Sequence, residues 1–203
     1  MEVEYISSYD ANSRPHGKSY GSWTVEWWRW VLAIPKFKNP IMDATGENTS
    51  IHQNNEHVSF LAGKMASENT ILPTRSCTVS SRKSILFPVI NCETNQLEQP
   101  ELKSHQEIID RVKKDEDSII KRECYVDGKP IIAERIKSDP VIFTLRLAEE
   151  NVFNVKGGNT YASADGYWVF LRPLPKGDHI VSFHGSCEYG KLNSGAVYHL
   201  WVT

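Results

Sequence analysis

The sequence predicts a mainly β protein, a β-sandwich or a jelly-roll-like barrel that carries a Trp-rich N-terminal helix and one amphipathic helix. Short apolar runs separated by turn residues fill most of residues 58–90 and 125–202. Only two segments, residues 23–33 and 105–122, show the apolar spacing of a helix. Many short strands with few helices are typical of sandwiches and barrels.

The totals favour one domain over residues 1–203, in which residues 1–19 are polar and irregular and form an extended N-terminal arm. The chain has 203 residues, of which 40% are hydrophobic and 24% charged, enough for a sizeable core. Its 23 basic and 25 acidic residues nearly balance, with a net charge of −2. We therefore expect no nucleic-acid partner and no membrane partner, because no basic surface is predicted.

The first residues and the cysteines bear on the compartment. The start MEVEYISSYD lacks the basic and apolar regions of a signal peptide, which predicts a cytoplasmic protein. Four widely spaced cysteines, without a Cys-x-x-Cys pair, make a structural zinc site improbable. We expect four mostly buried thiols. Disulfides, with three complete pairings open, are the alternative. The four residues are Cys77, Cys92, Cys124 and Cys187.

The stretch SWTVEWWRW, residues 22–30, places four of the six tryptophans in one helix. Ser22 is the expected N-cap, and Pro35 disfavours helical geometry at the preceding residue, which gives a helix over residues 23–33. Apolar residues occupy nearly its whole circumference, which is typical of a helix buried between other elements. The alternatives are a platform for carbohydrate or another flat ligand, with Trp28 as candidate ligand-binding ring, and an interfacial membrane helix.

Local signals order the remaining elements. The polar residues 80–83 predict a hairpin between the apolar runs 77–79 and 85–90, and Pro88 indicates an edge strand or a bulge. The capping box at residues 104–107 starts the amphipathic helix.

Two further hairpins are predicted in the C-terminal half of the chain. The Asp127-Gly128 pair predicts a tight hairpin. The turn at residues 173–178 predicts antiparallel pairing of residues 167–172 with residues 179–184.

Several short motifs together resemble a group of uncharacterised bacterial and archaeal proteins. They are Gly-x-Ser-Tyr at 17–20, Trp-Trp-x-Trp at 27–30, Asn39-Pro40 with Asp43-x-Thr45-Gly46, Phe-Leu-Ala-Gly at 60–63, Phe-Pro-Val-Ile-Asn at 87–91, Asp127-Gly128, and Asp-Gly-Tyr at 165–167 with Pro-Leu-Pro-x-Gly-x-His at 173–179. Members often carry export signals, so the resemblance implies an extracytoplasmic location. It implies no activity and no catalytic residues.

Candidate site residues rest on local arguments, because Gly-x-Ser-x-Gly and His-Glu-x-x-His are both missing. His179 and His184 are five residues apart, so a regular strand points them to opposite faces, and we expect no metal between them. His52 and His57 flank polar residues before a strand. Glu26 lies among four tryptophans, where desolvation would favour its protonated form; pairing with Arg29 is the alternative.

These observations predict a non-catalytic binding or structural module, with carbohydrate as the best ligand and Trp28, His52 and His57 as ligand-binding candidates. Sugars stack on aromatic rings and hydrogen-bond to the Asn and Gln side chains that the loops supply. We expect no cofactor and no metal. The alternative is a hydrolase with a carboxylate or histidine site at Glu26, His179 or His184. An oligomer-forming structural protein is the third reading.

Overall fold

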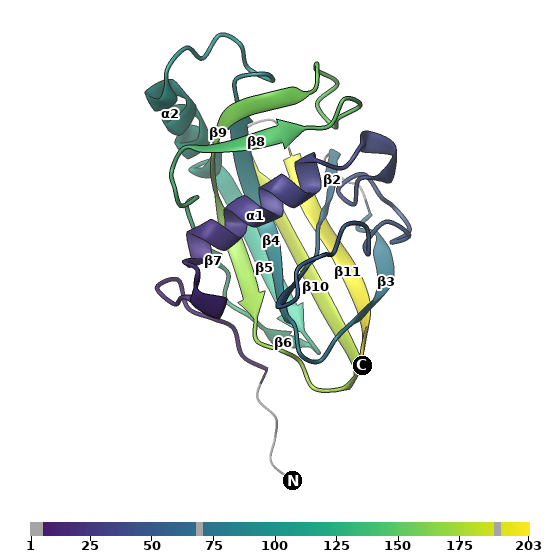
Figure 1. Ribbon diagram of the computed structural model, residues 1–203. Helices are drawn as coiled ribbons and strands as arrows, with labels where there is room; N and C mark the ends of the chain where they lie inside the picture. Colours follow the sequence, from purple (N-terminus) through teal and green to yellow (C-terminus); the bar gives the residue numbers. More distant parts are fainter. Residues whose placement is uncertain (1–5, 68–70, 189–191) are drawn as a thin grey trace.

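The computed structural model describes residues 6–67, 71–188 and 192–203 and confirms a mainly β, sandwich-like fold (Figure 1). Sheet A has the strand order β1-β4-β9-β7, with β8 also pairing with β9. Its strands are β1 (Val58–Phe60), β4 (Ser84–Asn95), β7 (Glu134–Arg135), β8 (Phe143–Leu147) and β9 (Gly158–Leu171).

Sheet B has the strand order β2-β11-β10-β5-β6, with β3 also pairing with β11. Its strands are β2 (Lys64–Ser67), β3 (Thr74–Val79), β5 (Ile119–Val126), β6 (Lys129–Pro130), β10 (Gly177–Cys187) and β11 (Leu192–Val202). Two pairings, β1 with β4 and β3 with β11, are parallel.

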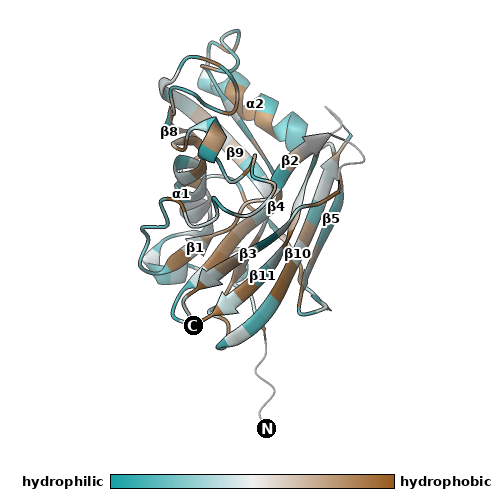
Figure 2. Ribbon diagram, turned by 90° about the vertical axis from the view of Figure 1, so that its right-hand side faces the viewer, coloured by the Kyte–Doolittle hydropathy of each residue, from teal (hydrophilic) through white to brown (hydrophobic). Residues whose placement is uncertain are grey.

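Sheet A is the middle one of three layers (Figure 2). Helix α1 (Tyr20–Leu32) covers one of its faces, and sheet B packs on the other. Strand β4 is therefore buried on both faces: Leu86 joins the core beneath α1, whereas Ile85 and Phe87 join the core between the sheets. This double burial explains why residues 85–90 are almost continuously apolar.

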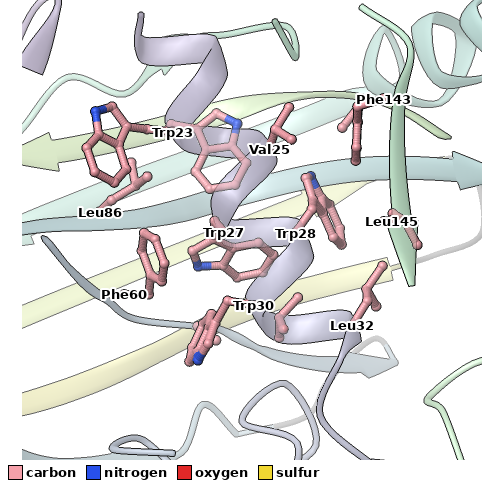
Figure 3. Close-up of a cluster of buried hydrophobic side chains, with 14 of the residues drawn as sticks. Trp23, Val25, Trp27, Trp28, Trp30, Leu32, Phe60, Leu86, Phe143 and Leu145 are labelled. Atoms are coloured by element: carbon pink, nitrogen blue, oxygen red, sulfur yellow. The ribbon is translucent and has the colours of Figure 1, made fainter. Parts of the chain in front are cut away.

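The tryptophans of α1 are buried, as the sequence predicts, with exposed fractions of 1 to 8%. In Figure 3 the helix presents Trp28 on the side of Phe143 and Leu145 of β8. Three indole N–H groups donate to backbone carbonyls: Trp23 to Pro15 at 2.7 Å, Trp27 to Leu61 at 2.8 Å and Trp30 to Ile51 at 2.9 Å. The stretch SWTVEWWRW is thus a core element that also binds three loop carbonyls.

Helix α1 begins one turn earlier than the predicted residue 23. Ser19, and not Ser22, is the N-cap, and its Oγ accepts the Ser22 N–H at 3.1 Å. Gly21 permits this start, because a Cβ there would lie 2.5 Å from the carbonyl oxygen of Lys137. The first turn is thereby held against the segment that precedes β8.

Helix α2 (His105–Glu116) carries the predicted capping box between Ser104 and Glu107. It ends before the predicted residue 122, because the chain from Ile119 onward pairs with β10 as strand β5. In the sequence, Ile120 continues the apolar spacing of the helix, but in the structure it is 69% exposed on strand β5.

The Asp-Gly hairpin is confirmed: β5 pairs with β6, and Asp127 and Gly128 have φ values of 50° and 74°. The other two predicted hairpins are wrong. Residues 173–176 connect β9 in sheet A to β10 in sheet B, and residues 80–83 connect β3 in sheet B to β4 in sheet A. Each turn carries the chain from one sheet to the other, so the strands on either side of it do not pair with each other; β10 pairs with β11, and β4 pairs with β9.

Pro88 lies at an irregularity of the β4–β9 pairing, which confirms a bulge. The strand that carries it is not an edge strand, because β1 and β9 flank it. A proline cannot donate to the ladder, and the shift in register between residues 88 and 90 accommodates that.

Between α1 and β1 the chain runs through η2 (Lys36–Lys38) and a long loop, which the side chain of Arg75 anchors. This arginine is 1% exposed and donates to the carbonyl oxygens of Ala62, Pro40 and Asp43, and to the Tyr198 hydroxyl. The loop is therefore tied to β3 and β11 by one buried guanidinium.

The segment before α1 contacts sheet A. The Tyr9 N–H donates to the Phe170 carbonyl at 2.8 Å, and the short 3-10 helix η1 (Pro15–Gly17) leads into α1. None of the four cysteines forms a disulfide in the described part of the chain; Cys124 and Cys187 are buried and the other two are partly exposed. Within the described ranges, no helix is long and apolar enough to cross a bilayer.

Candidate functional site

Glu26 is a half-buried member of an ion-pair cluster. Its Oε1 lies 3.6 Å from Lys18 Nζ and 3.5 Å from an Arg29 guanidinium nitrogen. It lines a surface hollow of about 410 Å³ together with His52 and Trp30. The structure thus brings two predicted site residues together, but Glu26 is paired with Arg29, which was the alternative interpretation.

His57 stacks on His16, with ring centroids 5.1 Å apart. The Nε2 atom of His16 lies 3.0 Å from Ser84 Oγ. Burial, together with His57, lowers the pKa of His16. Ser84 is fully buried, so this Ser-His contact does not present a nucleophile to solvent.

His179 and His184 lie on opposite faces of β10, as the sequence parity predicts. The strand alternates, with Val181 and Phe183 buried on the face of His179. His179 Nδ1 lies 2.7 Å from Asp127 Oδ2 and its Nε2 lies 2.9 Å from the Pro175 carbonyl, so both ring nitrogens are engaged. Across the described residues, no group of three His, Cys, Asp or Glu side chains is placed to hold a metal ion.

Trp28 lines a different site, a cavity of about 340 Å³ that we call the end cavity. Near it the two sheets approach closely at Gly185, where an added Cβ would lie 2.4 Å from Ile90 Cβ. Beyond this contact β4 and β10 line a cavity, which α1, α2, β2 and β11 complete. Its wall is formed by Trp27, Trp28, Ile41, Gly63, Met65, Pro88, Asn91, Cys92, Glu93, Glu98, Gln99, Arg111, Asp115, Phe153, Cys187, Leu192 and Ser194.

Two carboxyl groups of this wall share one amide. The Nδ2 of Asn95 lies 3.4 Å from Glu93 Oε2 and 3.5 Å from Glu98 Oε2, so these two oxygens are no more than about 7 Å apart. Asn95 is fully buried, and its Oδ1 accepts the backbone N–H groups of Leu97 and Glu98. The turn after β4 therefore fixes the amide that holds both carboxyl groups.

The environment separates the two acids. Burial raises the pKa of the Glu93 carboxyl well above its ordinary value, and the Glu98 carboxyl raises it further. Burial also raises the pKa of Glu98, to about 7, where Arg111 opposes the shift and Asp115 adds to it. Arg111 itself pairs with Asp115 at 3.0 Å along α2. Burial thus favours the neutral form of Glu93, beside a Glu98 carboxyl group whose pKa is about 7.

Four buried polar atoms from residues of the wall have no hydrogen-bond partner among the described residues. Two are N–H donors, Trp28 Nε1 and Asn91 Nδ2, and two are oxygens, Glu93 Oε1 and Gln99 Oε1. Leaving a buried polar group unpaired costs about 1 to 3 kcal/mol. Four such atoms on residues that line one cavity make the end cavity a candidate site.

Behind this wall, Glu116 of α2 is 1% exposed. Burial raises its pKa to about 8, and Asp165 adds to that shift while Arg135 opposes it. Burial and the Glu116 carboxyl together raise the pKa of the neighbouring Cys92 thiol. This thiol is therefore protonated and a poor nucleophile.

A larger hollow of about 630 Å³ lies between the loop after α1 and residues 149–155. Several of its polar groups are partnered: Lys36 donates to Asn154 at 2.8 Å, and Asn151 donates to the carbonyls of Ala148 and Val155. The end cavity is the stronger candidate because four buried polar atoms of its wall residues lack a hydrogen-bond partner among the described residues.

In comparisons with protein-family models, curated proteins and solved structures, nothing matches this chain. The resemblance to a group of uncharacterised proteins stays a prediction. Of the predicted ligand-binding residues, Trp28 lines the end cavity, whereas His52 and His57 do not. Sequence reasoning missed Glu93 and Glu98; the alternation of polar residues at the end of an apolar run, in Asn-Cys-Glu-Thr-Asn, was the available signal.

Proposed function

We propose that the protein is a non-catalytic binding module that takes a small hydroxylated ligand, with carbohydrate as the best class, in the end cavity. One observation carries the proposal: residues that line a cavity with an indole wall contribute two buried N–H donors and two buried oxygens that have no partner among the described residues. A hydroxyl group both donates and accepts, so one polyol can satisfy groups of both kinds.

Size and chemistry agree with a small ligand. A cavity of about 340 Å³ lies at the lower end of the range of small-molecule sites. Trp27, Trp28 and Phe153 supply aromatic surface, and Asn91 and Gln99 supply neutral polar groups. Mostly apolar walls with a few convergent polar groups are typical of ligand pockets.

The test is calorimetric titration and thermal unfolding with monosaccharides and polyols at up to about 10 mM, a range that covers millimolar dissociation constants. We expect at least one ligand to raise Tm in the parent protein. Its affinity is expected to fall five- to tenfold in Trp28→Phe, which removes the unpartnered N–H but keeps an aromatic ring. Trp201→Phe is the matched control, because Trp201 is 53% exposed on strand β11. Equal affinities of the two variants, or no binding at all, would overturn the proposal.

A second candidate function is hydrolysis of a glycosidic bond by Glu93 and Glu98. The observation that favours it is the shared Asn95 amide, which keeps the two carboxyl oxygens no more than about 7 Å apart, below the upper limit of roughly 9.5 Å for paired carboxylates in glycoside hydrolases. Glu93 would donate a proton to the leaving oxygen, and Glu98 would take one from water. Glu26 and His179 are engaged in ion pairs or hydrogen bonds, so the carboxyl pair replaces them as candidate groups.

This candidate is tested with a panel of aryl glycosides at pH 5 to 8. Release of the aryl alcohol by the parent and its loss in both Glu93→Gln and Glu98→Gln would support hydrolysis. Turnover that persists in both variants would exclude this pair as the acid and base.

A further inference from the structure

We infer that the ligand of the end cavity carries a positively charged amine beside its hydroxyl groups, and that the ammonium group binds to Glu93. This inference rests on the proposed function and names the ligand class, a hydroxylated amine such as an amino sugar. Three features support this inference: the ionisable groups of the wall, its aromatic surface, and the proton that Glu93 would release on binding.

The wall has more acids than bases. Its described residues include three acids, Glu93, Glu98 and Asp115, and one base, Arg111. Arg111 donates from Nε to both carboxylate oxygens of Asp115, at 3.0 and 3.3 Å, and opposes the rise in the pKa of Glu98. Among the described residues, Glu93 Oε2 has the long contact from the neutral Asn95 amide, and Glu93 Oε1 has no hydrogen-bond partner. A cationic ligand would stabilise the charged form of this carboxyl group.

The aromatic residues favour the same ligand. An ammonium group within about 6 Å of an indole face is stabilised by roughly 0.5 to 2 kcal/mol, and more when water is excluded. Trp27 and Trp28 line the same cavity as Glu93. Aromatic surface beside an unpaired carboxyl group is a combination that recognises amines, whereas a neutral sugar would use the aromatic surface and leave the Glu93 carboxyl group without a charged partner.

Binding of an amine should release a proton from Glu93, and this release can be measured. In the empty cavity Glu93 is a neutral acid because burial disfavours its charge. When R–NH₃⁺ binds, the carboxyl O–H bond breaks, the carboxylate pairs with the ammonium group, and the proton leaves to solvent. Net charge is conserved in this exchange. Other ionisable groups lie around Glu93 and Glu98. They are Glu98 itself and Glu101 from the loop after β4, Asp115 and Arg111 from α2, and Cys92 from β4.

The experiment compares matched amine and hydroxyl ligands by calorimetric titration at pH 7: glucosamine with glucose, galactosamine with galactose, and ethanolamine with ethylene glycol. Each titration is repeated in two buffers with different ionisation enthalpies, which measures protons released. We expect the amine of at least one pair to bind ten times more tightly or better, with release of up to one proton. Both effects should be lost in Glu93→Gln. Glu123→Gln, an exposed position on β5, is the matched control and should keep both.

The outcomes separate the two proposals. Equal binding of amine and hydroxyl ligands, or no proton release, overturns the cationic ligand and leaves the proposed function standing. No binding by any pair overturns both. If Glu93→Gln fails to fold, the proton release of the parent protein decides.

Discussion

Replacing Trp27 with Ala tests whether α1 is the central core element. Trp27 is 1% exposed and lies edge-on to Trp28, Trp30 and Trp168, with ring centroids 5.0, 5.9 and 5.3 Å away. A tryptophan buries roughly 150 to 250 Å², or about 4 to 6 kcal/mol at 25 cal/mol per Å². Large-to-small substitutions of buried aromatics cost about 3 to 5 kcal/mol in practice.

The hydrogen bond adds to this cost, because the buried Leu61 carbonyl accepts the Trp27 N–H at 2.8 Å and would be left unpaired. That loss is worth about 1 to 3 kcal/mol. We therefore expect Trp27→Ala to lower the free energy of unfolding by at least about 3 kcal/mol and Trp27→Phe by about 1 to 3 kcal/mol.

Urea unfolding followed by far-UV circular dichroism measures both losses, with the slope on denaturant concentration checked for constancy. Trp201→Ala is the matched control; its ring is 53% exposed, so we expect a loss below about 1 kcal/mol. If Trp27→Ala cost no more than Trp201→Ala, the reasoning that assigns α1 to the core would be refuted.

Three further predictions concern the interior and the charge. Glu116 has a raised pKa of about 8 in the folded protein, so the stability that its proton provides is complete below the unfolded pKa near 4.5 and is lost as the pH rises through 8. At pH 9 the free energy of unfolding of Glu116→Gln should therefore exceed that of the parent by more than about 2 kcal/mol. Urea unfolding at a series of pH values should show that this difference disappears by pH 4. Gly185→Ala should destabilise by about 1 to 3 kcal/mol, seen as a lower Tm, because its Cβ would enter the space of Ile90; an unchanged Tm would contradict the close approach of the sheets. Finally, random-sequence DNA should show no salt-sensitive mobility shift at submicromolar protein, since the net charge is −2.

The elements that could be predicted are those whose signals are local. The capping box at Ser104 and Glu107 and the Asp127-Gly128 turn need only neighbouring residues, and α1 is apolar on nearly every side whatever surrounds it. The partner of a strand is not local. Residues 85–90 and 167–171 are apolar on both faces because sheet A has a helix on one side and sheet B on the other. A turn signal after such a strand does not say which sheet the chain enters next.

The site illustrates the same limit. Trp28 could be singled out because its ring type suggests ligand contact. Glu93 and Glu98 are ordinary acids in a polar stretch, and only the packing of α2 and β10 over the end of β4 makes their environment unusual. The sequence also suggested Glu26 as a buried acid, but its position on the less apolar strip of α1 leaves it accessible to Lys18 and Arg29.

The anchoring of the loop by Arg75 has a consequence for ligand affinity. Its guanidinium holds the carbonyls of Pro40 and Asp43, which flank Ile41 of the cavity wall, and the Ile41 carbonyl accepts the N–H of Met65, another residue of that wall. Moving this part of the wall would separate the buried Arg75 guanidinium from its hydrogen-bond acceptors, which costs several kcal/mol. A ligand therefore meets a surface whose backbone is already ordered, and little of its binding energy is spent on conformational entropy.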